Sequence, residues 1–386
     1  MSHIDEFTSD LTPAGVRWAA LGAVCVIKTG QAINKIEIAE SPGDYPVINS
    51  GRDPLGYLAR FNTEDDPIGI TSRGAGVGSI TWCTGKYFRG NLNYSATVRS
   101  PDDVLQRFLY YWLTGHQKDI QALATYDGIP ALNKGSLEQL AIAIPPLEVQ
   151  REIVRILDHF TELEAELEAE LEARKRQHAY YRASLLAFED EEIQWAKLSD
   201  VATFQNAKAH EKLVDPEGDV ALMTSKFIST EGKSARYVNS PDVLTPAHRG
   251  QTALVMSDLP NGRALAKAFF VDEDGKYAAN QRVCLLEPRD SQTLNSRFLF
   301  YVVDRNRQLL AYDSGVDQTH LKKDWILNID LPIPPLARQE EIVRTLDSFR
   351  ALIHDLSSGL PAELVARRKQ YEYYRDKLLT FEESVA

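Results

Sequence analysis

Apolar residues recur at every third or fourth position in two long stretches of the chain, and charged residues fill the positions between them. The first stretch follows Pro145 and Pro146, where proline is tolerated because the first N–H groups of a helix have no partner. Its apolar positions are Ile153, Leu157, Phe160, Leu163, Leu167, Leu171, Tyr181, Leu185 and Phe188. Those of the second stretch are Ile342, Leu346, Phe349, Leu352, Leu356, Leu364, Tyr374 and Leu378. This spacing predicts two long amphipathic helices, each with one apolar stripe.

A helix of this length extends for roughly 60 Å, which is too long for its stripe to be buried against one small globular unit. We therefore expect the two helices to pack on each other antiparallel, as a long αα-hairpin or coiled coil. Gly359 and Pro361 predict a kink or a short break in the second helix. The alternative is that each amphipathic helix packs only on its own domain and is otherwise solvated.

The two helical stretches are copies of one another. IPPLEVQREIVRILDHF at 144–160 returns as IPPLARQEEIVRTLDSF at 333–349, and ARKRQHAYYRASLLAFE at 173–189 returns as ARRKQYEYYRDKLLTFE at 366–382. The offset between the copies grows by four residues, which predicts one extra helical turn between Phe349 and Arg367. Two matched blocks in the same order indicate an internal repeat rather than chance similarity.

Each globular half mixes strand and helix patterns. Short apolar runs predict strands within 67–82, 252–259, 266–272 and 282–288, and helical spacing covers 101–125 and 295–312. The predicted fold class is α+β: two mixed α/β domains joined by two long helices that pack as an antiparallel coiled coil, with a pseudo-twofold internal repeat. The domains are 1–145, a central spacer helix at 146–193, 194–332, and a distal spacer helix at 333–386.

The acidic balance of the chain is concentrated in one segment. The net charge is −12, and residues 141–193 account for −7 of it, whereas both globular halves are close to neutral. The overall charge therefore does not exclude nucleic-acid binding by a globular half. Three cysteines without metal-ligand spacing, a polar N-terminus and the lack of an apolar run of about 20 residues predict a cytoplasmic protein.

Known catalytic motifs do not occur in the sequence. There is no HExxH, no CxxC pair, no GxSxG and no Asn/Asp-Pro-Pro-aromatic motif, and the two Pro-Pro steps are flanked by Ile and Leu. The glycine-rich stretch from Gly74 to Gly78 lacks the Lys-Ser/Thr of a phosphate-binding loop. Glu231-Gly-Lys233 and Asp274-Gly-Lys276 have an acid-x-Lys spacing seen in nucleases, but without the paired Pro-Asp context. The sequence therefore predicts a chain without catalytic activity or a metal site.

The repeated helix motif resembles a known family. Ile-Pro-Pro-Leu-x-x-Gln, followed by a helix ending in Gln-x-x-Tyr-Tyr-Arg-x-x-Leu-Leu-x-Phe, occurs twice and resembles the specificity (S) subunit of type I restriction–modification enzymes. The Glu-Leu-Glu-Ala repeat of the central helix is similar to the C subfamily of that group. The resemblance implies two target-recognition domains, each reading one half of a split, asymmetric site on double-stranded DNA.

The resemblance also implies partners. The helices would recruit two methyltransferase (M) subunits, which hold S-adenosylmethionine and flip and methylate adenine, and restriction (R) subunits that consume ATP with Mg²⁺ would join them. No cofactor is expected in this chain. Two other classes of function stay open: a self-contained DNA methyltransferase or nuclease, and an acidic helical scaffold that does not bind DNA.

Residue types near glycines and predicted turns give candidates for base readout, because Arg and Lys suit guanine whereas Asn and Gln suit adenine. They are Arg73, Lys86, Arg89, Asn133 and Lys134 in the first half, and Arg263, Gln281, Arg282, Gln318, His320, Lys322 and Lys323 in the second. Surface solubility or phosphate contact is the alternative role for any one of them.

The repeated helix starts give candidates for subunit binding, since an internal repeat offers two similar surfaces. They are Gln150, Ile153, Arg155 and Leu157, and Gln339, Ile342, Arg344 and Leu346, which could equally be intramolecular core and cap positions.

The Glu-Leu-Glu-Ala repeat predicts a spacer. Leu163, Leu167 and Leu171 recur every four residues, so one repeat lengthens the helix by about 6 Å and rotates the stripe by only ~40°. We expect the number of repeats to set the gap between the two half-sites on DNA. The alternative is a replication slip in a tolerant, solvated helix.

Overall fold

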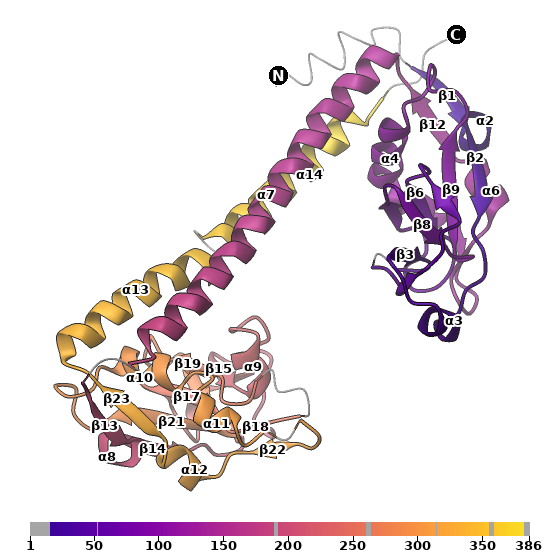
Figure 1. Ribbon diagram of the computed structural model, residues 1–386. Helices are drawn as coiled ribbons and strands as arrows, with labels where there is room; N and C mark the ends of the chain where they lie inside the picture. The colour runs from indigo at the N-terminus through magenta and orange to yellow at the C-terminus, as the bar shows by residue number, and fades with distance from the viewer. Residues whose placement is uncertain are drawn as a thin grey trace. The chain divides into compact units, whose positions relative to one another are not determined.

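The computed structural model describes residues 16–51, 53–188, 192–259, 264–313, 315–354 and 359–381, and Figure 1 shows its elements. The chain divides into two compact units. Unit 1 comprises Met1–Ala169 and Ala362–Ala386, and unit 2 comprises Glu170–Pro361. Each unit combines one globular domain with part of the long helix α7 (Leu147–Leu185) and with a helix of the C-terminal repeat.

The globular domain of unit 1 contains two four-stranded sheets. The main sheet has the order β2-β9-β6-β7 and is antiparallel throughout, and the smaller sheet has the order β4-β3-β8-β5, with β3 and β8 parallel. Two strand pairs, β1-β12 and β10-β11, complete it. The strands are β1 (Arg17–Ala20), β2 (Cys25–Thr29), β3 (Tyr45–Ile48), β4 (Tyr57–Leu58), β5 (Thr63–Glu64), β6 (Ile68–Thr71), β7 (Ile80–Trp82), β8 (Lys86–Arg89), β9 (Asn93–Val98), β10 (Ala124–Thr125), β11 (Ala131–Leu132) and β12 (Ala141–Ile144). The short helices are α2 (Leu21–Val24), α3 (Lys35–Glu40), α4 (Gln106–Gly115), α5 (Gln117–Ala122) and α6 (Lys134–Glu138).

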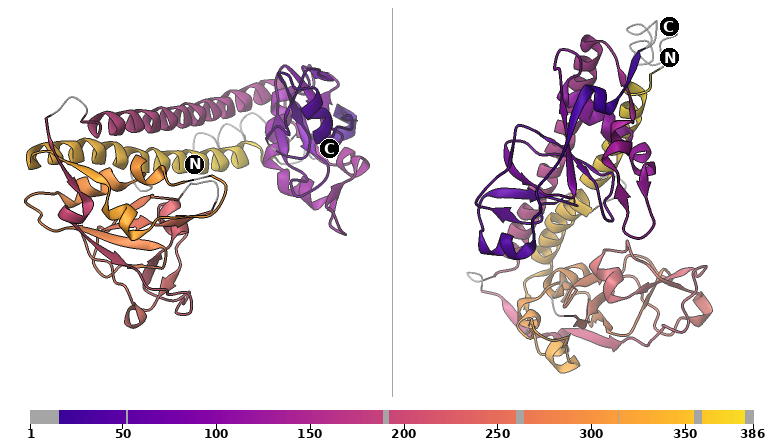
Figure 2. Two further views of the ribbon diagram at one scale, coloured as in Figure 1. Left: turned by 60° about the horizontal axis from the view of Figure 1, so that its bottom comes forward. Right: turned by 90° about the vertical axis from the view of Figure 1, so that its right-hand side faces the viewer.

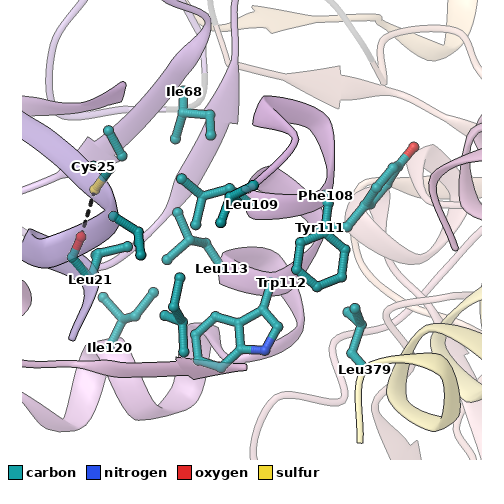
Figure 3. Packing of buried hydrophobic residues seen from close by; sticks show 14 of the residues in the cluster. Leu21, Cys25, Ile68, Phe108, Leu109, Tyr111, Trp112, Leu113, Ile120 and Leu379 are labelled. Carbon is teal, nitrogen blue, oxygen red and sulfur yellow. Dashed lines mark hydrogen bonds between the residues drawn. The ribbon is translucent and has the colours of Figure 1, made fainter. Parts of the chain in front are cut away.

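The core of unit 1 lies between the main sheet, α4 and the long helices. Phe108, Leu109 and Trp112 of α4 are buried there, and Leu157 of α7 belongs to the same cluster. Figure 3 shows Leu379, just beyond the end of α14, beside Trp112 in this core. Cys25 donates a hydrogen bond to the carbonyl oxygen of Leu21 at 3.1 Å, and burial raises the pKa of its thiol to about 12. The globular domain and its helices therefore share one apolar core.

Unit 2 repeats this plan with a four-stranded sheet β14-β21-β17-β19, a three-stranded sheet β16-β15-β20 and the pairs β13-β23 and β18-β22. Its strands are β13 (Gln194–Lys197), β14 (Ala202–Asn206), β15 (Val220–Met223), β16 (Tyr237–Val238), β17 (Thr252–Val255), β18 (Ser257–Asp258), β19 (Ala268–Phe270), β20 (Tyr277–Ala279), β21 (Val283–Pro288), β22 (Thr319–His320) and β23 (Asp330–Ile333). Its helices are α8 (Leu198–Val201), α9 (Ser225–Ser229), the 3-10 helix η1 (Ser240–Asp242), α10 (Ser296–Val303), α11 (Arg307–Leu310), α12 (Lys323–Leu327) and α13 (Leu336–His354). Figure 2 shows this domain from two further sides.

The long helices pair antiparallel within each unit. In unit 1, Phe160 of α7 stacks on Tyr374 of α14 (Leu360–Leu378), and Arg368 forms ion pairs with Glu164 and Glu168. In unit 2, Phe349 of α13 stacks on Tyr181 of α7, and Ile342 and Leu346 share the core with Leu185 and Leu186. The residue numbers rise along one helix as they fall along the other, so the predicted fold class is confirmed.

The structure divides two of the predicted helices and has a helix boundary at the predicted break. The predicted helix at 101–125 is two helices, α4 and α5, and that at 295–312 is also two, α10 and α11. In the second case Arg305 has φ +53°, a left-handed conformation that ends a right-handed helix. The break expected near Gly359 and Pro361 coincides with the boundary between α13 and α14, and the extra turn expected there falls partly on residues 355–358, outside the described part.

Candidate nucleic-acid interface

An open pocket of about 730 Å³ lies where four segments of unit 2 meet. Three of them form one backbone junction, and they are the β17–β18 connection, the turn before β21 and the segment around β22; the fourth is the end of β14. The lining residues are Asn206, Ala207, Met256, Gln281, Arg282, Val283, Gln318, His320 and Leu321. Four residues predicted from sequence to read DNA, Gln281, Arg282, Gln318 and His320, are therefore brought together at one site.

Backbone hydrogen bonds fix this junction. Met256 N donates to Arg282 O at 2.8 Å, and Leu321 N donates to Met256 O at 2.7 Å, so the central segment holds the other two. Arg282 has φ +70°, a conformation that residues other than glycine adopt only when the surroundings impose it. Its guanidinium is thus carried by a tight turn whose backbone is fixed on both sides.

The other side chains of the pocket have polar neighbours. Gln318 Nε2 donates to Ser257 Oγ at 3.0 Å, and Gln281 Nε2 donates to Glu211 Oε1 at 2.6 Å. His320 is exposed on β22, opposite Ser257. Amide and imidazole groups fixed in an open, polar pocket beside a guanidinium can donate to and accept from the edges of base pairs.

Unit 1 contains the same backbone junction. Ser72 N donates to Leu92 O at 2.9 Å, and Leu132 N donates to Ser72 O at 2.8 Å, as Met256 and Leu321 do in unit 2. Arg73 follows Ser72 and forms a bridge with Ala131. Asn133 and Lys134 follow Leu132, so three predicted residues of unit 1 lie at this junction. Asn133 Oδ1 also caps α6 by accepting from Gly135 N at 2.7 Å, and Lys134 lies 3.5 Å from Glu138.

Arg89 is a correction to the predicted set, because it is a structural residue. Its side chain is buried, and its guanidinium donates to the carbonyl oxygens of Ile68, Tyr94 and Asp66 at 2.7 to 3.0 Å. It also lies 3.6 Å from the Asp66 carboxylate, and burial lowers its pKa. Because its guanidinium is buried and bonded to these backbone groups, Arg89 cannot reach a base edge.

The remaining candidates lie apart from the junction or beside it. Lys86 is exposed on the smaller sheet, 4.8 Å from the ring of Phe61 and 3.5 Å from Glu64. Lys322 and Lys323 are exposed next to the pocket and lie over the rings of Trp325 and Phe204. Arg263 lies outside the described residues.

Gln150 and Gln339 are the second correction, because both are fully buried and hold the domains on their helices. Gln150 Oε1 accepts from Leu105 N at 2.8 Å, and its Nε2 donates to Asp103 O and Pro145 O at 2.9 and 2.8 Å. Gln339 accepts from Asn295 N at 2.8 Å and donates to Thr293 O and Pro334 O at 2.9 and 2.8 Å. Neither amide is available to another protein.

The apolar candidates for subunit binding are also core residues. They are Ile153, Leu157, Ile342 and Leu346, all fully buried. Arg155 and Arg344 are exposed, and Arg155 pairs with Glu152 on its own helix. These positions of the apolar stripe therefore pack in the core of their own unit. The spacer leucines Leu163, Leu167 and Leu171 are half-buried, as expected of a two-helix seam.

A second duplicated network ties each domain to its helix. Arg107 Nε and Tyr111 OH both donate to Asp158 Oδ1, at 2.7 and 2.5 Å. Arg297 and Tyr301 bond Asp347 in the same way, with Arg297 Nε at 2.8 Å. Each arginine also lies 4.5 Å from an aromatic ring, Trp82 in unit 1 and Phe270 in unit 2.

Sequence reasoning missed a pair of exposed tyrosines. Tyr180 on α7 and Tyr373 on α14 occupy equivalent positions of the repeat and are 69% and 53% exposed. Each is preceded by a basic residue one helical turn earlier, Arg176 and Lys369. The signal was present in the repeated Tyr-Tyr-Arg motif, whose first tyrosine faces solvent while its second stacks in the helix pair.

No group of three or more His, Cys, Asp or Glu side chains that could hold a metal ion occurs among the described residues. None of the helices in that part of the chain is both long and apolar enough to cross a membrane.

Comparisons with known proteins agree with this architecture. The model of the type I restriction modification DNA specificity domain matches residues 15–173 and 190–366. The chain is 30% identical to a putative type I restriction enzyme specificity subunit of Haemophilus influenzae over 374 residues, covering 91% of this chain and 94% of the relative. It is 28% identical to the EcoR124I/EcoR124II specificity subunit of Escherichia coli, covering 99% and 98%. The crystal structure of a type I restriction-modification S subunit from M. genitalium superimposes with a TM-score of 0.60 at 18% identity, over 95% of this chain and 96% of that one. The chain therefore belongs to the family of type I restriction–modification DNA specificity proteins and carries one specificity domain in each half.

Proposed function

We propose that the chain reads a bipartite DNA target, with one half-site bound at the backbone junction of each unit. The observation that carries this proposal is the duplicated junction itself. The same three segments are joined by the same backbone hydrogen bonds in both units, and the side chains around them differ. A common frame with different side chains is what two domains need in order to read different sequences.

The side chains fit base readout in the major groove. Arg282 can donate two parallel hydrogen bonds to guanine O6 and N7, and Gln281 or Gln318 can pair with adenine N6 and N7. In unit 1, Arg73 and the amide of Asn133 supply the same chemistry. Each such pair discriminates by about 1–3 kcal/mol. Lys86, Lys134, Lys322 and Lys323 suit phosphate contacts, which give affinity without sequence information.

The chain is a DNA-recognition subunit and not an enzyme. We assign methyl transfer and cleavage to separate methyltransferase and restriction subunits, which supply S-adenosylmethionine, ATP and Mg²⁺. The complex would act in the cytoplasm, where its DNA substrate lies.

The exposed tyrosines are our candidates for the docking of two methyltransferase subunits. Tyr180 and Tyr373 are equivalent in the repeat, so they offer two similar surfaces, as two copies of one partner require. Tyrosine is enriched among the few residues that supply most of the binding energy of protein interfaces. Arg155 and Arg344 remain candidates for the same docking surfaces. The double variant Tyr180→Ala and Tyr373→Ala should bind fewer than two methyltransferase subunits in native mass spectrometry.

The base-readout proposal is tested with Arg282. In the complex with methyltransferase subunits, Arg282→Ala should relax one half-site in the methylated motif and leave the other intact. Arg282→Lys keeps the charge but loses the planar pair of donors, so it should relax the same half-site while preserving most of the affinity. A motif that is unchanged in both variants would remove Arg282 from the interface.

A further inference from the structure

Large aliphatic side chains stand in solvent beside the junction of each unit. In unit 1, the loop between β10 and β11 leaves Ile129 63% exposed, and in unit 2 the loop that leads into β22 leaves Val316 76% exposed. Each follows a glycine in the left-handed conformation, Gly128 with φ +94° and Gly315 with φ +68°. The two halves thus keep an exposed β-branched residue at the same point of a loop that otherwise differs.

The described residues of both loops form hydrogen bonds within or beside the loop. Asp313 Oδ1 accepts from Gly315 N at 3.0 Å and from Thr319 Oγ1 at 3.2 Å. In unit 1, Gly74 N donates to Pro130 O at 2.9 Å, and Tyr126 OH donates to Gln121 O at 3.2 Å. Exposing an aliphatic side chain to water costs free energy, and contact with an apolar surface would recover it.

Cationic and amide groups flank both tips. The backbone of Arg73 forms a β-bridge with Ala131, which lies two residues after Ile129. Lys134 is the first residue of α6, three residues after Ala131. Gln318 and His320 follow Val316 and line the pocket with Arg282. An apolar tip framed by groups that suit phosphates and base edges is complementary to double-stranded DNA, whose apolar surface is exposed when two base pairs unstack.

We propose that Ile129 and Val316 insert between base pairs as wedges, one in each half-site, and bend the DNA that the units read. In proteins that bind the minor groove, aliphatic side chains that enter a base step unstack it and kink the duplex, and the two tips would do the same beside side chains that read the major groove. This inference rests on the proposed function, because it requires both junctions to face DNA. The bend would add sequence preference at steps that no side chain contacts, since flexible steps deform most easily.

The test uses the complete complex with methyltransferase subunits and a duplex carrying its methylated motif. The variants are Ile129→Ser and Val316→Ser. The matched controls are Ile36→Ser on α3 of unit 1 and Leu244→Ser in unit 2, which are 69% and 45% exposed elsewhere in their domains. The bend is measured by energy transfer between dyes at the duplex ends. Unstacking is measured with 2-aminopurine placed in turn at each base other than the target adenines.

Each loop variant should lose the 2-aminopurine signal in its own half-site, reduce the bend and bind on the order of tenfold more weakly, while the controls stay unchanged. The salt dependence of affinity should not change, because no phosphate contact is removed.

Three results would overturn the wedge. The first is an unchanged bend and affinity in both loop variants. The second is a wild-type complex that loses the same affinity when uracil replaces thymine, which would mean that the side chains read a thymine methyl group. The third is a loop variant that fails to hold methyltransferase subunits, which would make the tips a protein interface. Failure of the proposed function itself looks different: the wild-type complex would then not distinguish the motif from a scrambled duplex.

Discussion

Phe160 of α7 stacks on Tyr374 of α14, with ring centroids 5.4 Å apart and 26° between the ring planes. Its counterpart in the repeat, Phe349 of α13, stacks on Tyr181 of α7 at 5.2 Å and 22°. Phe160 and Phe349 are equivalent in sequence, and so are Tyr374 and Tyr181. The first half of each helical repeat therefore packs on the second half of the other repeat. The same sequence motif, present twice, thus supplies the aromatic contacts of both helix pairs.

These stacked pairs should stabilise the helix pairs. Phe160→Ala and Phe349→Ala should each lower the free energy of unfolding by about 1–2 kcal/mol, because each removes an aromatic pair from a half-buried seam. Tyr180→Ala, on the exposed side of α7, should leave the stability within about 0.5 kcal/mol of wild type. Urea unfolding followed by circular dichroism measures both effects, and an equal loss in all three variants would contradict the role of the stacks.

The buried glutamines should be more sensitive than any exposed residue of the same helices. Gln150→Ala or Gln339→Ala would leave one backbone N–H and two carbonyl oxygens without their partner, at a cost of about 2–4 kcal/mol. The control is Arg155→Ala, which removes an exposed ion pair within one helix and should change stability by no more than about 0.5 kcal/mol. If both glutamine variants unfold at the wild-type denaturant concentration, the hydrogen bonds at the domain–helix joint do not hold it.

The sequence predicted the elements that depend on local spacing and failed where long-range packing decides. The 3.6-residue period located α7, α13 and α14, and the repeat predicted that both units share one plan. Burial was the weak point. Gln150 and Arg89 look like surface residues, yet each satisfies backbone groups that only the folded domain brings near. Tyr180 and Tyr181 are neighbours in a repeated motif, and only the helix pair shows that one stacks while the other faces solvent.

Alkaline pH should destabilise the chain through the tyrosines that bond Asp158 and Asp347. Burial, followed by the hydrogen bond to the carboxylate, raises the pKa of Tyr111 and of Tyr301 above the ordinary value of 10.0. The folded state thus holds these phenol protons more tightly than the unfolded chain does. The stability that these two tyrosines contribute to the folded state is fully present below pH 10 and is lost as the pH rises through their folded-state pKa.

Urea midpoints measured between pH 7 and pH 11 test this. Tyr111→Phe and Tyr301→Phe should be less stable at pH 7 by about 1 kcal/mol, from the lost hydrogen bond, but should show a shallower alkaline decline. Tyr180→Phe is the exposed control and should follow wild type. A wild-type midpoint that stays constant up to pH 11 would contradict the raised pKa values.

Spacer length should set the gap between half-sites. Deleting Glu166–Ala169 moves Leu171 and Glu172 to the positions of Leu167 and Glu168, so the seam and the pairs with Arg368 can re-form. The helix shortens by about 6 Å, and the gap in the methylated motif should shrink by about one or two base pairs. Deleting only Glu166 and Leu167 turns the stripe away from its partner and should lower stability. An unchanged gap in a folded, active four-residue deletion would show that the repeat is not a spacer.

The most direct test of the account is the methylated motif of a chimaera in which residues 194–332 are replaced by the corresponding segment of a relative that reads another sequence. The chimaera is expressed with its methyltransferase subunits, and all modified adenines are mapped by sequencing. If each unit reads its own half-site, the motif keeps the first half-site and the gap and acquires the second half-site of the donor. A motif in which both half-sites change, or in which neither does, would contradict the assignment of one half-site to each unit.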